Sequence, residues 1–395
     1  MNKSTARGKA RRGVDGAVNI SDLRKIARSK MPRLLFDFVD GGVEDEVALA
    51  TNAAAYSRIH LLPRYAVNVS TVSQKTAIFG QEFSSPFGIC PSGLNAMYQP
   101  DGDLVLARVA KEMGIPYTLS SASAASLEQA AKAAAGNLFF QLISIRDRKI
   151  VDDFVKRTLD TGVKTLFFTV DVPVHGIRER NIRNGMTLPF RPRLTHILDA
   201  LQRPQWLGYY LRSGMPVPGN WRAYAAPNAP DADVWRVYND NMFDPAYTWE
   251  DIKRIRDLWP HHFVVKGILS TDDAMRAKSI GANGLVVSNH GGRQLDRAPA
   301  SIDVLPAIRA AVGPDMTLIL DSGIRRGTDI IAALCSGANF CLFGRPTLFG
   351  LMAGGEAGVR RAITIFKDEI DMALGQLGCP DIRQLGPKFL ARNQQ

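Results

Sequence analysis

The segment from Ser288 to Arg293 carries side chains that could act on an acid substrate. His290 is followed by two glycines, Gly291 and Gly292, and then by Arg293. A single histidine is most often structural, but glycines let a ligand approach the backbone closely, and arginine presents a planar fork that fits a carboxylate. A base beside a carboxylate clamp is suited to oxidising or deprotonating an acid. We therefore predict that His290 is a catalytic base and that Arg293 binds the substrate.

Two further charged residues, Asp171 and Arg178, follow an earlier apolar run. Asp171 ends that run. A carboxylate there could be a helix N-cap, but Pro173 two residues later disfavours an immediate helix. We predict instead that Asp171 stabilises protonated His290, as the carboxylate of a catalytic triad does. Arg178 is either a second cation for the substrate or the surface partner of Glu179.

Lysine and arginine also occur where a phosphate-bearing cofactor could bind. Lys266 follows an apolar run, and a buried lysine needs an anionic partner. It could form a Schiff base, or it could supply a fixed positive charge beside a cofactor that becomes anionic. The segments Asp321–Gly327 and Gly344–Pro346 combine glycines with arginines, which is typical of an anion-binding nest. We predict that these two segments hold a phosphate.

These polar residues follow apolar runs of strand length, and helical patterns separate most of the runs. Such alternation is typical of an α/β fold with a parallel sheet covered by helices. Eight strand–helix units predict a (β/α)8 TIM barrel, in which the carboxyl ends of all strands lie at one face. A doubly wound sheet is the alternative, but the chain has neither a GxGxxG turn nor a Walker A sequence. The eight runs are Pro86–Cys90, Pro116–Leu119, Leu138–Phe140, Thr165–Val170, Phe263–Val265, Gly284–Val287, Met316–Leu320 and Phe340–Phe343.

The connection between the fourth and fifth runs is about three times as long as the others. We therefore predict an insertion at about residues 180–248 on the active-site face of the barrel. All five tryptophans lie between Trp206 and Trp259. An aromatic-rich segment of this kind is typical of a lid, a substrate wall, a membrane-contacting plate or a small subdomain.

The ends of the chain complete the expected organisation. Helical patterns at 23–30 and 33–39 would cap the bottom of the barrel or extend along its side, and 356–377 would form a closing helix. We expect one barrel domain over residues 21–385, preceded by a basic arm at 1–20 and followed by a tail at 386–395.

The composition excludes several classes of protein. A chain of 395 residues with a hydrophobic fraction of 46% can bury a large core, and without a run of 18 apolar residues it predicts no transmembrane helix. The four cysteines form no CxxC pair and have no histidine at zinc spacing, so we expect neither disulfides nor a metal site. Most of the net charge of +11 lies in residues 1–33, which hold ten lysines and arginines and two aspartates. This pattern indicates a solvated basic arm or a contact with an anionic membrane, and it does not indicate nucleic-acid binding.

Together these motifs resemble the FMN-dependent α-hydroxy acid dehydrogenase/oxidase family, which includes glycolate oxidase, mandelate dehydrogenase and respiratory L-lactate dehydrogenase. The resemblance extends from about residue 20 to about residue 385. Its most specific part is Ser288–Asp296, which is close to the active-site signature of the family. The other similar segments are Asp37, Gly41–Asp45, Pro91–Gly93, Phe139–Gln141, Thr169–Asp171, Asp321–Gly327 and Gly344–Pro346.

The resemblance implies FMN as the cofactor and a role for each matched residue. His290 would be the base and Asp171 its stabilising partner, while Arg293 and Arg178 would bind the substrate carboxylate. Lys266 would stabilise the reduced, anionic flavin. The other cofactor contacts would come from Pro91, Ser92, Gly93, Ser120, Gln141, Thr169, Ser288, Asp321, Ser322, Gly323, Ile324, Arg325, Gly344 and Arg345, with the two arginines at the phosphate.

Two substrate-contacting tyrosines of the family are absent here. Phe38 and Ile143 occupy the positions where the family usually has a tyrosine hydroxyl that contacts the substrate carboxylate. Each hydrogen bond to a charged group contributes roughly 1.5–3 kcal/mol, so small acids such as glycolate or lactate should bind poorly. The apolar replacements favour a bulky or aromatic substrate. We therefore expect oxidation of such a 2-hydroxy acid to the 2-oxo acid.

The resemblance also bears on the electron acceptor and on partners. Oxidases of the family commonly have alanine where this chain has Gly93, and Pro204–Trp206 is similar to respiratory lactate dehydrogenases. We expect a quinone or another carrier as the acceptor, with oxygen as the alternative, in a homotetramer that is cytoplasmic or peripheral on the inner face of the membrane. The same flavin chemistry on an amine or a bulky natural-product intermediate is an alternative function. Flavin binding without turnover is another, which the retained catalytic set argues against.

Overall fold

The centre of the protein is a closed barrel of eight parallel strands, seen in a computed structural model that describes residues 13–187 and 191–391. Neighbouring strands follow the order β10-β3-β4-β5-β6-β7-β8-β9, which confirms the predicted (β/α)8 barrel and excludes a doubly wound sheet. The strands read as continuous apolar runs because both of their faces are buried. Their bounds are β3 (Phe87–Ile89), β4 (Tyr117–Ser120), β5 (Leu138–Leu142), β6 (Thr165–Thr169), β7 (His262–Ile268), β8 (Gly284–Val287), β9 (Thr317–Leu320) and β10 (Phe340–Phe343).

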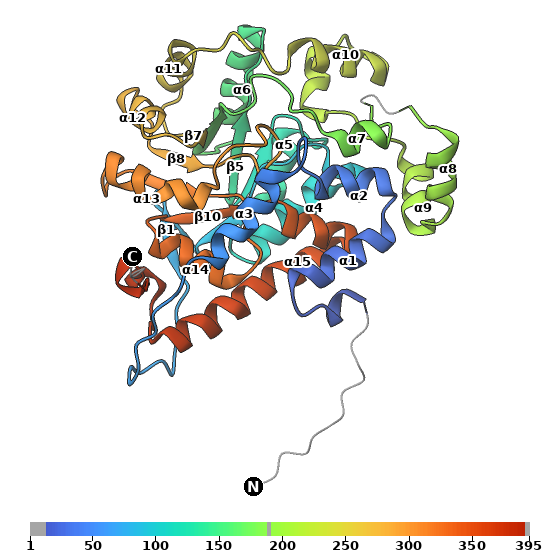
Figure 1. Ribbon diagram of the computed structural model, residues 1–395. Helices are drawn as coiled ribbons and strands as arrows, with labels where there is room; N and C mark the ends of the chain where they lie inside the picture. Colours follow the sequence, from blue (N-terminus) through green and yellow to red (C-terminus); the bar gives the residue numbers. More distant parts are fainter. Residues whose placement is uncertain (1–12, 188–190, 392–395) are drawn as a thin grey trace.

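Helices surround the barrel, one after each strand (Figure 1). The last of them, α15 (Arg345–Leu377), is broken at Gly354 and Gly355, whose dihedral angles are not helical. The Nζ of Lys30 donates to the Ala353 carbonyl at this break, at 2.6 Å. The predicted closing helix at 356–377 is therefore the second part of α15. The other barrel helices are α4 (Gly102–Glu112), α5 (Leu127–Ala134), α6 (Arg148–Asp160), α11 (Trp249–Leu258), α12 (Thr271–Ser279), α13 (Ser301–Val312) and α14 (Gly327–Cys335).

A short antiparallel hairpin closes the amino-terminal end of the barrel. Its strands are β1 (Thr76–Ile78) and β2 (Gln81–Phe83). The ring of Phe83 packs 6.1 Å from that of Phe139 and 5.9 Å from that of Phe340, near the start of β5 and β10. The apolar interior of the barrel is thus sealed at the end opposite to the strand carboxyl ends.

The N-terminal segment runs along the side of the barrel and reaches the face where the strands end. After η1 (Gly13–Gly16), α1 (Ile20–Lys30) packs beside α15, and α2 (Arg33–Asp40) and α3 (Val47–Ser57) follow (Figure 1). Arg24 binds Asp40 through two hydrogen bonds of 2.5 and 2.8 Å, which fix α1 to the end of α2. The first twelve residues of the basic arm lie outside the described residues.

The insertion between β6 and β7 is helical. It consists of α7 (Glu179–Arg183), α8 (Leu194–Leu201), α9 (Pro204–Ser213), η3 (Gly219–Tyr224) and α10 (Asp231–Asn241), and α8 and α9 lie at one edge of the molecule (Figure 1). The chain ends with η4 (Ile382–Gln384) and η5 (Pro387–Phe389). Within the described ranges, no helix combines the length and the apolar content that crossing a bilayer requires.

Candidate active site

A cavity of about 280 Å³ lies at the carboxyl ends of the barrel strands and brings together nearly all the predicted site residues. Two of them, Asp171 and Ser288, do not line the cavity but hydrogen-bond to His290 and Lys266, which do. The predicted residues that line it are Phe38, Pro91, Ser92, Gly93, Ser120, Gln141, Ile143, Thr169, Arg178, Lys266, His290, Arg293, Asp321, Ser322, Gly323, Ile324, Arg325, Gly344 and Arg345.

His290 is oriented by a carboxylate and by its own loop. Its Nδ1 lies 2.9 Å from Oδ1 of Asp171, which leaves Nε2 for a substrate. The backbone φ of His290 is 58°, in the left-handed region, and its N–H donates to the Ser288 hydroxyl at 3.0 Å. Strained backbone of this kind persists where the surroundings hold it and is common at functional sites. The pair has the geometry of a general base with its orienting carboxylate.

Helix α3 holds the loop that carries His290. The amides of Asn52 and Asn289 bond each other twice, at 2.8 and 2.7 Å, in a buried position. Gly292 has a φ of 72°, and a Cβ there would come within 2.6 Å of the Leu49 backbone nitrogen, so only glycine fits. The N-terminal segment thereby fixes the position of His290.

Two half-buried arginines face the cavity without a carboxylate partner in the described part of the chain. Arg293 donates to the carbonyls of Phe38 and Gly41, at 2.7 and 3.1 Å. Arg178 donates to the side chain of Gln294 at 3.2 Å, and its buried Nε has no partner. Burial, followed by the charge of Arg293, lowers the pKa of Arg178 to about 9. Two desolvated cations with donors to spare are suited to bind an anion.

The predicted alternative for Arg178, a surface pair with Glu179, is wrong. Glu179 pairs with Arg183 one helical turn later, on the exposed side of α7. Arg178 precedes α7 and is turned inward, where it lines the cavity. The physical reason is local: the i,i+4 spacing gives Glu179 a nearer cation on its own helix face.

Lys266 is a fixed cation in the wall of the cavity. Its Nζ lies 2.8 Å from Oδ2 of Asp321 and donates to the Ser288 hydroxyl at 2.8 Å. Burial alone would lower the pKa of Lys266, but Asp321 raises it above its ordinary value; burial alone would raise the pKa of Asp321, but Lys266 lowers it. A Schiff-base role requires a neutral amine, so this pairing disfavours it and favours a charge that stabilises an anionic cofactor.

A chain of polar side chains crosses three neighbouring strands. The Ser120 hydroxyl donates to Oε1 of Gln141 at 2.9 Å, and Nε2 of Gln141 donates to the Thr169 hydroxyl at 2.7 Å. Nearby, a Cβ on Gly93 would meet the Ala122 side chain and carbonyl at 3.1 Å, so this wall is already closely packed. Such an arrangement fits the polar edge of a planar ring system.

The other end of the cavity carries an excess of positive charge on half-buried side chains. Arg345 donates to the carbonyls of Val39, Gly291 and Gly41, each at 2.8 Å, and Arg325 donates to that of Ile324 at 2.7 Å. Burial lowers the pKa of both guanidinium groups, and for Arg345 the charges of Arg293 and Arg325 lower it further. Carbonyl oxygens do not neutralise these charges, so the cluster fits a phosphate group.

Sequence reasoning missed several residues of the cavity wall, most notably Tyr98 and Tyr238. Tyr98 follows η2 (Asn95–Met97) in the loop after β3, and Tyr238 lies on α10 of the insertion. Their positions in the sequence could have pointed to them. Tyr98 follows a segment predicted to bind the cofactor, and Tyr238 lies within the aromatic-rich insertion. Which aromatic residues of an insertion turn inward depends on its fold.

Comparison with known proteins agrees with this geometry. Residues 27–392 match the FMN-dependent dehydrogenase family. The chain is 40% identical to (S)-mandelate dehydrogenase of Pseudomonas putida over 94% of its own length and 93% of the relative's, and 39% identical to L-lactate dehydrogenase of Pseudomonas syringae over 94% and 98%. It superposes on a crystal structure described as the monotopic membrane protein (S)-mandelate dehydrogenase with a TM-score of 0.91, 39% identity and coverage of 95% and 99%. The chain is a member of the FMN-dependent dehydrogenase family and an FMN-dependent oxidoreductase.

Proposed function

We propose that this enzyme oxidises a bulky or aromatic 2-hydroxy acid to the 2-oxo acid. The observation that carries the proposal is one cavity lined by His290, which Asp171 orients from behind, and by two arginines, Arg178 and Arg293, without a carboxylate partner among the described residues. Relatives named for mandelate and lactate act on acids of this class, which supports it.

The chain's own residues divide the work of this reaction. Arg293 and Arg178 hold the substrate carboxylate, which places the 2-hydroxyl near His290. Nε2 of His290 takes the hydroxyl proton, and Asp171 stabilises the imidazolium through Nδ1. FMN would supply the oxidant for this step, taking up from C2 of the substrate its hydrogen and the two electrons of the C–H bond. Lys266 holds positive charge beside the site where the Ser120–Gln141–Thr169 chain and the Arg325–Arg345 cluster would hold the cofactor.

The wall of the cavity supports a substrate with a large apolar group. Phe38 and Ile143 bring no hydroxyl to the cavity, and Val172 and Phe243 add further apolar surface. Burying such a group contributes roughly 25 cal/mol per Å². An aromatic acid therefore gains affinity here that lactate or glycolate does not.

Anaerobic bleaching of the flavin tests the proposal. We expect mandelate-like acids to reduce the bound FMN faster than small 2-hydroxy acids, and α-amino compounds to leave it oxidised. His290→Ala should slow this reduction by at least about 10²-fold while FMN stays bound, whereas His261→Ala, a half-buried histidine outside the cavity, should match the parent. Reduction by amines alone would favour the alternative substrate class, and no reduction by any candidate would favour flavin binding without turnover.

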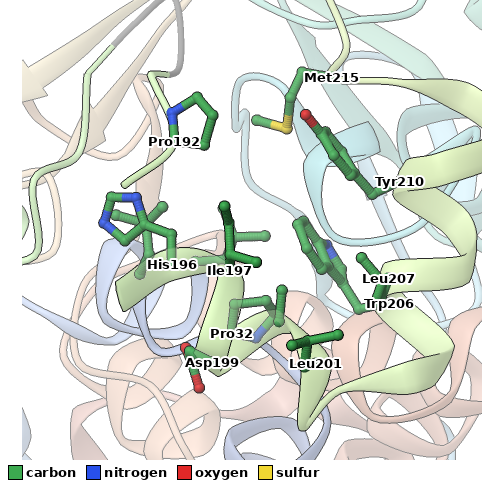
Figure 2. A pocket seen from close by; sticks show the side chains of 13 residues that line it. Pro32, Pro192, His196, Ile197, Asp199, Leu201, Trp206, Leu207, Tyr210 and Met215 are labelled. Carbon is green, nitrogen blue, oxygen red and sulfur yellow. The ribbon is translucent and has the colours of Figure 1, made fainter. Parts of the chain in front are cut away.

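We further propose that α8 and α9 contact an anionic membrane. These helices expose five large apolar side chains, each with about half to three-quarters of its surface accessible: Leu194, Ile197, Leu198 and Leu201 on α8, and Leu211 on α9. A second, almost wholly apolar pocket of about 100 Å³ lies beneath them, and Figure 2 shows Ile197, Trp206 and Met215 turned toward it. The relative described as a monotopic membrane protein supports a peripheral contact.

Sedimentation with vesicles of anionic phospholipid tests this contact. Leu198→Glu with Leu201→Glu should abolish co-sedimentation, while Leu258→Glu on α11, also exposed, should not. Equal binding of the parent, the double variant and Leu258→Glu would exclude α8 from the contact.

Two further measurements test the expected electron acceptor and oligomeric state. Steady-state assays with a soluble quinone and with oxygen decide between the proposed carrier and oxygen as acceptor. Light scattering tests the expected homotetramer.

A further inference from the structure

Two tyrosines in the cavity wall have hydroxyls without a partner. Tyr98 is 2% exposed and Tyr238 is 8% exposed, and both line the cavity that holds His290. Across residues 13–187 and 191–391, neither hydroxyl forms a hydrogen bond with another side chain or backbone group. The buried hydroxyls of Tyr56 and Tyr117, by contrast, donate to Ser322 and Asp103. Since these two hydroxyls are unpaired in residues that line the cavity, they are suited to bind a ligand there.

Both tyrosines line the same cavity as Arg178 and Arg293, which we assign to the substrate carboxylate. Burial raises the pKa of Tyr98, while the charges of Arg293 and Arg178 act on it in the opposite direction. Burial also raises the pKa of Tyr238, and Arg178 opposes this shift. Because both pKa values stay above the ordinary value, both phenols keep their protons and can donate.

Rigid contacts fix the two rings. The indole N–H of Trp206, on α9, donates at 2.9 Å to the carbonyl of Met97, and this bond holds the turn that carries Tyr98. The Tyr238 ring packs edge-on against Trp221 at 5.4 Å and Trp235 at 5.6 Å. The tryptophans of the insertion therefore position the two phenols.

We propose that Tyr98 and Tyr238 donate hydrogen bonds to the carboxylate of the substrate, in the role that Phe38 and Ile143 cannot fill. The inference rests on the proposed function. The hydroxyl donors have moved to the loop after β3 and to α10, so the carboxylate keeps its full set of donors. The positions of Phe38 and Ile143 are then free for the apolar group of the substrate.

Binding of a carboxylate and of its neutral counterpart to the FMN-loaded enzyme tests the assignment. The probes are phenylglyoxylate and phenylglyoxylamide, titrated against the flavin absorbance. Tyr98→Phe and Tyr238→Phe should each raise the Kd for the acid by about tenfold and that for the amide by less than about twofold. The matched control is Tyr209→Phe, at a half-buried tyrosine of α9 that lies outside the cavity and whose hydroxyl accepts a hydrogen bond from Gln205; it should bind both probes like the parent. FMN content reports whether each variant is folded.

The outcomes separate this inference from the proposed function. If 2-hydroxy acids reduce the parent flavin but both variants bind the acid like the parent, or lose acid and amide equally, the carboxylate assignment is wrong and the proposed function stands. If the parent binds the acid and depends on both tyrosines, but no 2-hydroxy acid reduces its flavin, the assignment stands and the proposed function fails. A parent that does not bind phenylglyoxylate overturns both.

Discussion

Gly267 lies directly against the carboxylate of Asp171. A Cβ built on Gly267 would come within 2.6 Å of both Cβ and Cγ of Asp171, and the φ of Gly267 is 106°, which other residues rarely adopt. The glycine occurs where the pairing of β7 with β8 shifts its register between Lys266 and Ile268. The irregularity in β7 thus makes room for the residue that orients His290.

Gly267→Ala should therefore impair catalysis by displacing Asp171. We expect flavin reduction to slow by at least about tenfold, because His290 would lose the carboxylate that fixes its ring. Stopped-flow reduction measures the effect. Gly375→Ala, a helical position with open space around it, is the matched control and should behave like the parent. A Gly267→Ala enzyme with parental rates would show that the contact does not constrain Asp171.

The paired amides predict that Asn52 acts at a distance from the substrate. Asn52→Ala removes two hydrogen bonds from the buried amide of Asn289, which keeps only those to the Pro299 carbonyl and the Gly292 N–H, and one lost buried partner costs about 1–3 kcal/mol. We expect a lower thermal midpoint and a lower kcat with FMN still bound, because Asn289 precedes the base. Asn52→Asp keeps one hydrogen-bond acceptor and should have a higher kcat than Asn52→Ala. If the thermal midpoint of Asn52→Asp returns to that of the parent but its kcat stays as low as that of Asn52→Ala, the pair does not position His290.

Arg293→Lys keeps the charge but removes the planar fork. A carboxylate held by two parallel hydrogen bonds loses that geometry to a point charge. We expect a loss of at least roughly tenfold in kcat/KM for the best aromatic acid, about 1.4 kcal/mol. An unchanged kcat/KM would mean that Arg293 does not grip the carboxylate, and it would favour an uncharged or amine substrate.

The Lys266–Asp321 pair predicts a specific dependence of stability on pH. Because Lys266 holds the pKa of Asp321 below the ordinary 3.8, the carboxylate contributes fully above that value and loses its contribution as the pH falls through its lower folded-state pKa. Asp321→Asn leaves a buried lysine without its anion, which typically costs about 3–5 kcal/mol. The thermal midpoints of the parent and of Asp321→Asn should thus differ most near neutral pH and converge below about pH 4. A gap that stays constant into acid would contradict the pairing.

The barrel could be predicted because its strands are short, apolar and buried on both faces. Each predicted run overlaps an observed strand, and the polar residues that end the runs line the cavity or, for Asp171 and Ser288, bond to residues that do, because parallel strands end at one face. The hairpin β1–β2 could not be predicted, since its three-residue strands carry too little pattern. The same holds for the first part of α15, whose break at Gly354 and Gly355 makes the sequence resemble a loop.

The residues alone made the site predictable where chemistry coincides with a strand end, and the family resemblance added positions such as Phe38 on α2. His290, Lys266 and Asp321 satisfy this condition. Tyr98 and Tyr238 do not, because their placement follows from how Trp206, Trp221 and Trp235 pack the insertion against the barrel. Arg178 likewise turns inward because Glu179 pairs with Arg183 on α7, which the sequence pattern alone did not decide.

The insertion is one uninterrupted stretch of chain, and it holds both the exposed leucines of α8 and the cavity wall at Tyr238. Evolution can therefore exchange it as a unit without disturbing the barrel strands on either side. Such an exchange would transfer surface character and substrate range together. For protein engineering the same linkage is a constraint: shortening this segment to remove its exposed apolar residues also reshapes the pocket, so solubility and specificity cannot be tuned separately by deletion.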